Sequence, residues 1–270
     1  MHLTKIIVLF TFLHLASFSQ NNRRVGDLDS TLSTKWKNLS IDSDIFKVNF
    51  SGADGAIGSN GYRGNSSYNN GGDGTAGSHG GSGSNGTMGA DVTIWYSVKI
   101  YEKDTLVFFH LAGNAKEIWQ VQQYGKARAL ISSAGGRGGD GGEGGKGGNG
   151  GDFNEKNQIG KGGDGGDGGH AGNGGNGGRI QVVTDSSSYR YFQHFSFNVD
   201  AGLGGHAGIA GSSGSDGMEN AETKGGKIIN FLVRSHSGRD GRNGMNGVSG
   251  MNGTVDFRLF PLVRINEELQ

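Results

Sequence analysis

Two carboxylates inside a glycine-rich stretch are the first residues of this chain whose spacing suggests metal chemistry. Asp164 and Asp167 lie three positions apart with glycines between them. Residues three apart on an extended left-handed helix are separated by roughly 9 Å, whereas calcium needs several oxygen ligands at about 2.3–2.6 Å. The stretch also lacks the apolar residue at the eighth position of the calcium-binding nonapeptide. We therefore predict a solvated row of carboxylates and no metal site.

Signals for a nucleotide site or a catalytic site are equally incomplete. The glycine fingerprint of dinucleotide-binding proteins occurs from Gly163 to Gly168, but any repeat of Gly-Gly-X generates it. No strand–helix pattern and no ribose-binding acid accompany it, and no H-E-x-x-H or G-x-S-x-G motif is present. The histidines beyond residue 19 are His79, His110, His170, His194, His206 and His236. Because no residues assemble the roles that catalysis requires, we predict a protein that is not an enzyme and that uses no cofactor.

Two rows of side chains have types and spacings suited to binding a partner. The first row consists of Thr75, Ser78, Ser84 and Thr87. Small hydroxyls about 9 Å apart resemble an ice-binding face, although such residues also suit packing against a neighbouring segment. The second row consists of Met245, Val248 and Met251. It either packs against other apolar rows or the sheet, or, if exposed, forms a patch that contacts a partner.

These rows exist because glycine recurs at every third position in six separate runs. The runs span 52–64, 71–89, 135–151, 160–178, 202–217 and 238–253. A period of three matches an extended left-handed helix with 3 residues per turn and a rise of ~3.1 Å, and a glycine edge lets another backbone approach closely. Such a helix has no internal hydrogen bonds, so its N–H and C=O groups need neighbours or water. We therefore expect a bundle of six such helices in three pairs.

The third and fourth runs carry two glycine sets each, which predicts close neighbours on two sides and a central place in the bundle. The glycines we assign a structural role are Gly141, Gly144, Gly147, Gly166, Gly169 and Gly172. The remaining row of each run is polar or charged and should face water.

Composition excludes several classes of protein. The 270 residues include 56 Gly, 1 Pro and no Cys. A collagen triple helix needs many prolines, and disulfides or thiolate sites need cysteine. Lys plus Arg and Asp plus Glu are 25 each, so no basic surplus points to nucleic acid.

The N-terminus has the pattern of a secretory signal peptide. Lys5 precedes an apolar run from Ile6 to Leu15, and small residues place cleavage between Ser19 and Gln20. The junction resembles signals of Gram-negative bacteria. An uncleaved anchor is the alternative, but the run is short for a span of ~20 residues. We expect residues 1–19 to be the signal, no membrane span after cleavage, and a secreted, periplasmic or cell-surface protein.

Alternating side chains predict β-strands between the glycine runs. The expected strands are Val92–Tyr101, Leu106–Leu111, Ala127–Ser133, Tyr189–Val199, Lys227–Arg234 and Val255–Ile265. They should form an antiparallel sheet or sandwich, with His194 on a polar strand face and almost no α-helix in the protein. We expect a flexible lead over 20–44, with a short helix near Ser30–Trp36, and a single domain over 45–270. Its modules are about 45–101, 127–184 and 195–265.

The triplet runs resemble those of polyglycine II bundle proteins, which include springtail antifreeze proteins and the glycine-rich tip adhesins of phage tail fibres. They are also similar to bacterial collagen-like Gly-X-X proteins. The resemblance covers about 100 residues and implies a polyglycine II bundle. This chain departs from the antifreezes in size and in lacking Cys, and from the phage adhesins in having a signal peptide.

The function we expect is that of an exported structural or adhesive protein that displays a rigid glycine-rich bundle. It should be a monomer whose partner is a cell-surface or matrix component such as a glycan. One alternative is ice binding through the hydroxyl row. Another is a glycan-binding or hydrolytic site on the β part.

Overall fold

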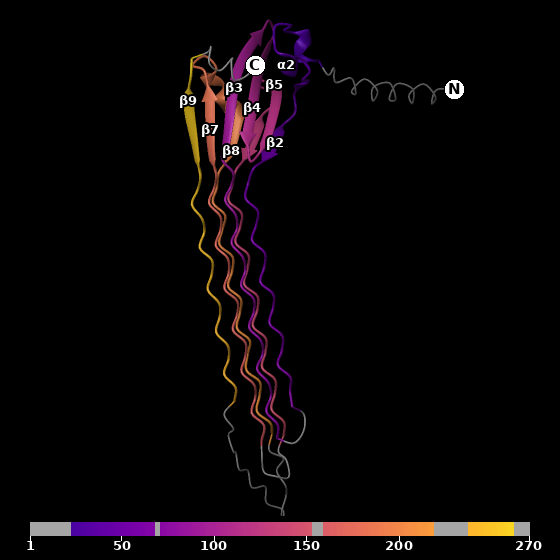
Figure 1. Ribbon diagram of the computed structural model, residues 1–270, viewed down its shortest axis with the longest axis vertical. Helices are drawn as coiled ribbons and strands as arrows, with labels where there is room; N and C mark the ends of the chain where they lie inside the picture. Colours follow the sequence, from indigo (N-terminus) through magenta and orange to yellow (C-terminus); the bar gives the residue numbers. More distant parts are fainter. Residues whose placement is uncertain (1–22, 68–70, 153–158, 219–236, 262–270) are drawn as a thin grey trace, which may run out of the picture.

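The computed structural model describes residues 23–67, 71–152, 159–218 and 237–261. A head of β-sheets carries six glycine-rich runs that extend side by side as a long stalk (Figure 1). Within the described ranges, the only α-helix is α2, Thr34–Lys37, which confirms the expectation of a mostly β and irregular protein. The predicted signal peptide and the predicted strand Lys227–Arg234 lie outside the described residues.

The chain builds head and stalk from three successive units. Each unit leaves the head from a strand, follows one run outward, returns along the next run and enters a second strand (Figure 1). The leaving strands are β2 (Phe46–Asn49), β6 (Ala129–Ser132) and β8 (Phe195–Asn198). The returning strands are β3 (Val92–Tyr101), β7 (Arg179–Thr184) and β9 (Thr254–Leu259). These units fall within the three modules expected from the sequence.

The strands form two sheets. The leaving strands make a three-stranded sheet, β2-β6-β8, in which all neighbours are parallel. The returning strands lie parallel in a six-stranded sheet of order β1-β5-β4-β3-β7-β9. Its other members are β1 (Ile41–Asp42), β4 (Asp104–Gly113) and β5 (Lys116–Gln123). The antiparallel pairs are β3 with β4 and β4 with β5.

The expectation of an antiparallel sheet was therefore wrong for most of the head. Equivalent strands of successive units point the same way, since each unit begins and ends in the head, and each parallel pair is joined by a long crossover through the stalk. Only the hairpins around β4 fit the antiparallel expectation. Strands β1, β2, β5 and β7 were not predicted from the sequence.

The main hydrophobic core lies between the two sheets. Ile94 and Phe109 of the six-stranded sheet are fully buried, and they belong to the same cluster as Ile131 and Phe195 of the three-stranded sheet. The rings of Phe109 and Phe195 meet edge to face with their centroids 5.4 Å apart. The head is therefore a sandwich whose inner faces carry the alternating apolar residues.

The other face of the six-stranded sheet is covered by the segment that precedes β2. This segment contains η1 (Val25–Asp27) and α2, while β1, which follows them, joins the edge of the sheet itself. The Trp36 ring in α2 packs against Phe108 and Trp119, with centroids 5.4 and 4.9 Å away, and Val25 is fully buried. A flexible lead was expected over 20–44, whereas residues from Val25 to β1 pack as part of the head.

The stalk has two layers, one of outgoing runs (first, third and fifth) and one of returning runs (second, fourth and sixth). Within a layer neighbouring runs are parallel, and the Gly138 N–H donates to the Leu203 carbonyl at 2.8 Å. Between layers they are antiparallel, and the Gly166 N–H donates to the Gly145 carbonyl at 2.8 Å. These bonds recur at every third residue, and the third and fourth runs each exchange them with four other runs.

Register passes from the strands into the runs without a break. Phe46 of β2 pairs with Ala129 of β6, and the same separation of 83 residues joins Asp54 to Arg137 in the stalk. In the returning layer, Arg179 pairs with Thr254, and a separation of 75 joins Asp164 to Arg239. The parallel strands of the head therefore align the runs that follow or precede them.

Candidate functional site

Polar side chains on the outer rows of the stalk accept hydrogen bonds from the backbone of the neighbouring run. Asp164 and Asp167 accept from the N–H groups of Arg239 and Arg242 at 2.6 and 2.7 Å. A backbone bond from His206 is the largest cause of the lowered pKa of Asp140. These carboxylates satisfy backbone donors that no other run reaches. No cluster of His, Asp or Glu in the described ranges is arranged to hold a metal ion.

The hydroxyls of the row Thr75, Ser78, Ser84 and Thr87 also accept backbone hydrogen bonds, at the edge of the stalk formed by the first and second runs. Thr75, Ser78, Ser84 and Thr87 accept from the N–H groups of Asn65, Tyr62, Ala56 and Ala53 at 2.6–2.7 Å. All four residues are exposed, yet each hydroxyl already accepts a hydrogen bond from a backbone N–H group of the first run. The structure thus places the row against a neighbouring segment, which was the alternative to an ice-binding face.

The second predicted row lies in the open on the outer surface of the returning layer. Met245, Val248 and Met251 are 67%, 70% and 72% exposed, so they do not pack against another apolar row. Met88 of the second run, 63% exposed, lies across Asn176 from Met251. The Asn176 carbonyl accepts from the Gly89 N–H, and its side chain accepts from the Met251 N–H at 2.8 Å. We call Met88, Met245, Val248 and Met251 the methionine strip.

The assigned structural glycines lie where no side chain has room. A Cβ on Gly144 would collide with the carbonyl oxygen of Gly166, and one on Gly141 would collide with that of Gly169. Gly147, Gly166, Gly169 and Gly172 face backbone carbonyls in the same way. All six therefore lie at contacts between one backbone and the next.

The histidines do not assemble a catalytic group among the described residues. His110 is stacked between Trp95 and Trp119, with ring centroids 5.2 and 4.0 Å away. His79 and His170 accept backbone bonds on the stalk, and His206 is exposed there. His236 lies outside the described residues.

His194 is a buried residue of the head and not part of a polar strand face. Tyr189–His194 form η2, a 3-10 helix, where a strand was expected. The imidazole is 1% exposed, and its Nε2 lies 2.8 Å from Oε1 of Gln122, whose Nε2 donates to the Asp44 carbonyl. Burial, and then the charge of Arg128, lower the pKa of His194 to about 4. A neutral ring that donates to Gln122 follows from this geometry.

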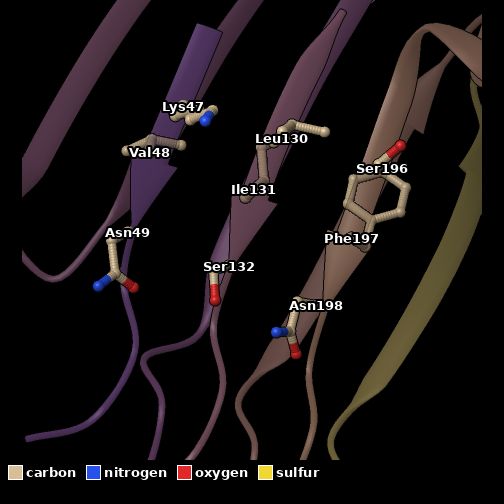
Figure 2. Close-up of a pocket in the computed structure, with 9 residues that line it drawn as sticks. All are labelled: Lys47, Val48, Asn49, Leu130, Ile131, Ser132, Ser196, Phe197 and Asn198. Carbon is tan, nitrogen blue, oxygen red and sulfur yellow. The ribbon is translucent and has the colours of Figure 1, made fainter.

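A shallow, mainly apolar depression of about 390 Å³ lies on the outer face of the three-stranded sheet (Figure 2). Each strand contributes three successive residues: Lys47, Val48 and Asn49 from β2, Leu130, Ile131 and Ser132 from β6, and Ser196, Phe197 and Asn198 from β8. Figure 2 shows Asn49, Ser132 and Asn198 in a row where the strands end. This site was not predicted from the sequence, although a polar residue ends each of the three strands three or four positions before a glycine run.

An aromatic cluster at the β9 edge was also missed. Tyr189, Phe192 and Phe257 lie with ring centroids 5.6–5.9 Å apart, and each side chain is about 40% exposed. The cluster exists because η2 turns its aromatic residues toward β9, which a continuous strand from Tyr189 would not do.

Comparisons with protein-family models, with curated proteins and with solved structures find no match to this chain. The described residues contain no helix of sufficient length and apolar character to cross a membrane.

Proposed function

We propose that the six runs are polyglycine II helices and that the stalk is a bundle of them. The support is the three-residue recurrence of backbone bonds between runs, which suits a helix of 3 residues per turn with no internal bonds. Positions where a Cβ would meet another backbone are glycine, as close approach demands.

We further propose that this protein is an exported, non-enzymatic adhesive protein that presents a rigid stalk to a cell-surface or matrix component. The methionine strip is the observation that carries this proposal. Large apolar side chains more than 60% exposed and gathered on one broad face are typical of a surface that contacts a partner. Methionine suits such a surface because its flexible thioether adapts to varied shapes.

The stalk explains how such a surface would be held in place. Val248 and Met251 donate their backbone N–H groups to Asn173 and Asn176 at 2.9 and 2.8 Å, so the strip is fixed to the central fourth run. The backbone positions of the sixth run therefore keep a constant spacing when a partner approaches, and little backbone entropy is lost on binding.

Export is proposed from the signal-peptide pattern of residues 1–19 and places the strip outside the cytoplasm. The monomeric state is proposed because each unit returns to the head and bonds to the other units of the same chain. Light scattering of the purified protein should give the mass of one chain. An obligate trimer that unfolds on dissociation would reject this part.

The adhesive function is tested by retention of purified protein on cells and on extracted surface matrix. A variant with Met245→Ser, Val248→Ser and Met251→Ser should lose retention while keeping the unfolding midpoint of the parent. The matched control carries Ser249→Ala, on the same run but outside the strip, and should be retained like the parent. Equal retention of the triple variant, or no retention of the parent on any surface, would refute the proposal.

A further inference from the structure

We propose that the depression on the outer face of β2, β6 and β8, with its apolar floor and polar rim, binds a carboxylate-bearing saccharide. The depression belongs to the sheet that continues into the outgoing layer, whereas the methionine strip lies on the returning layer. The inference rests on the proposed function only in that both treat the chain as a binding protein.

The charge around the depression suits an anion. Lys47 is exposed at its rim, and the exposed Arg128 lies two residues before Leu130, on the same face by strand alternation. Neither cation is part of an ion pair with the described residues. No acidic side chain lines the depression. A carboxylate would therefore meet Lys47 at the rim, with Arg128 farther along the same face, and no acidic residue in the lining.

The side-chain groups left for a ligand are mainly donors, because the Ser132 hydroxyl is already paired with that of Ser51 at 2.8 Å. The Asn49 and Asn198 side chains use Oδ1 to accept from the N–H groups of Ser51 and Asp200, at 2.8 and 2.9 Å. Their amide nitrogens are the polar atoms left for a ligand, and an amide nitrogen only donates. The exposed Ser196 hydroxyl adds a group that both donates and accepts. Ring, hydroxyl and carboxylate oxygens of a sugar acid accept such bonds.

The centre of the depression is apolar. Leu130 is half-buried and lies in register between Lys47 and Ser196. An apolar floor flanked by a cation and a hydroxyl matches the C–H face and polar rim of a pyranose ring. The volume of about 390 Å³ is within the usual range of small-molecule sites, ~300–1,000 Å³, and exceeds what one inorganic anion fills.

Calorimetric titration of the full chain with oligogalacturonate tests the inference, with two further ligands as controls. The methyl-esterified oligosaccharide keeps the sugar and removes the charge, and inorganic phosphate keeps a charge and removes the sugar. We expect oligogalacturonate to bind at least about tenfold more tightly than either control. Equal binding of the methyl ester would overturn the role of the carboxylate, and equal binding of phosphate would overturn the role of the sugar.

Variants locate the site. Lys47→Met should weaken oligogalacturonate binding about tenfold, and Ser196→Ala should weaken it a few-fold. Lys146→Met, which removes an exposed cation from the stalk, should leave it unchanged. Unchanged binding by Lys47→Met, or no binding by the parent, would overturn the inference. This test is independent of the one for retention on cells, because the triple variant of the methionine strip keeps the depression and should still bind oligogalacturonate.

Discussion

The head and the stalk are stabilised by opposite parts of the chain. In the head, Ile94, Phe109 and Leu111 are fully buried side chains of a sandwich core. In the described parts of the stalk, every buried residue is glycine. The head thus buries side chains around a hydrogen-bonded sheet, whereas the stalk buries backbone against backbone and turns nearly all its side chains outward.

This difference shows which interactions stabilise each region. Burial of apolar area stabilises the head by roughly 25 cal/mol per Å². The stalk has little of that area, and each backbone bond adds a net ~0.5–1.5 kcal/mol. The stalk therefore depends on complete pairing of its N–H and C=O groups, and a single displaced backbone leaves several of them without partners.

Gly144→Val should give the largest loss of stability. Its Cβ would collide with the Gly166 carbonyl and approach the Gly211 N–H, so two neighbouring runs must move. We expect the free energy of unfolding to fall by at least about 4 kcal/mol, although replacing glycine restores about 0.4–1 kcal/mol through the unfolded chain. The control is Glu143→Val on the exposed row, which should stay within about 0.5 kcal/mol. Denaturant unfolding that finds Gly144→Val as stable as the parent would refute the close-packed stalk.

Trp36→Ala tests the head in the corresponding way. It removes the ring that packs on Phe108 and Trp119, and we expect a loss of about 3 kcal/mol, the low end for such truncations. Tyr62→Ala removes an aromatic ring that is 84% exposed on the stalk and should change little. Similar unfolding free energies for the two variants would mean that the segment before β2 does not stabilise the head.

Acid should weaken the head through His194. Its pKa is lowered from 6.5 to about 4 by burial, so below pH 6.5 the unfolded chain takes up a proton that the folded chain does not. The free energy of unfolding should therefore fall as pH drops from 6.5 toward 4, by ~1.4 kcal/mol per pH unit and about 2 kcal/mol at pH 5.

His194→Gln should remove this dependence, with His206→Gln on the stalk as the control for the substitution. Chemical denaturation at several pH values measures both slopes. An identical slope in His194→Gln and the parent would contradict the assignment. The pKa of Asp29 is lowered from 3.8 to about 2, first of all by a hydrogen bond from the Thr31 side chain. Protonation of Asp29 therefore lowers the free energy of unfolding only below about pH 3.8.

Removal of one side-chain acceptor from the stalk should have the smallest effect. Asn173 accepts from the Val248 N–H at 2.9 Å on an exposed row, so Asn173→Ala should cost about 0.5–1 kcal/mol. Asn173→Asp keeps an acceptor and should cost less. The ranking of these two variants in unfolding experiments checks whether surface carboxylates and amides pair the outer backbone. Loss in Asn173→Asp equal to that in Asn173→Ala would argue against it.

The sequence predicted the stalk better than the head because glycine spacing reports contacts directly. Two glycine sets in the third and fourth runs predicted close neighbours on two sides, and in the structure each of these runs bonds to four others. Glycine spacing could not predict that Thr75 and Asp164 accept backbone hydrogen bonds, because that role depends on which run lies beside them. The spacing of Met245, Val248 and Met251 likewise could not tell whether this row is exposed to solvent or packed against another element.

In the head, alternation alone was misleading. Tyr189, Tyr191 and Phe195 fit a period of two, but Asp185 accepts from the N–H groups of Ser187 and Ser188 at 2.8 Å, and the chain turns into η2. Such side-chain turns compete locally with strand formation. The burial of Trp36 was missed because a single helical turn has too few residues to show a period.

Native-state amide hydrogen exchange tests the central claim most directly, namely that hydrogen-bonded backbone, without a side-chain core, orders the stalk. The N–H groups of Gly141 and Gly144 donate to His206 and Ile209 carbonyls at 2.8 Å, and no side-chain core surrounds them. We predict that they exchange as slowly as the amide of Ile94 in the core of the head. Exchange at the rate of an unfolded chain, with Ile94 still protected, would contradict the account.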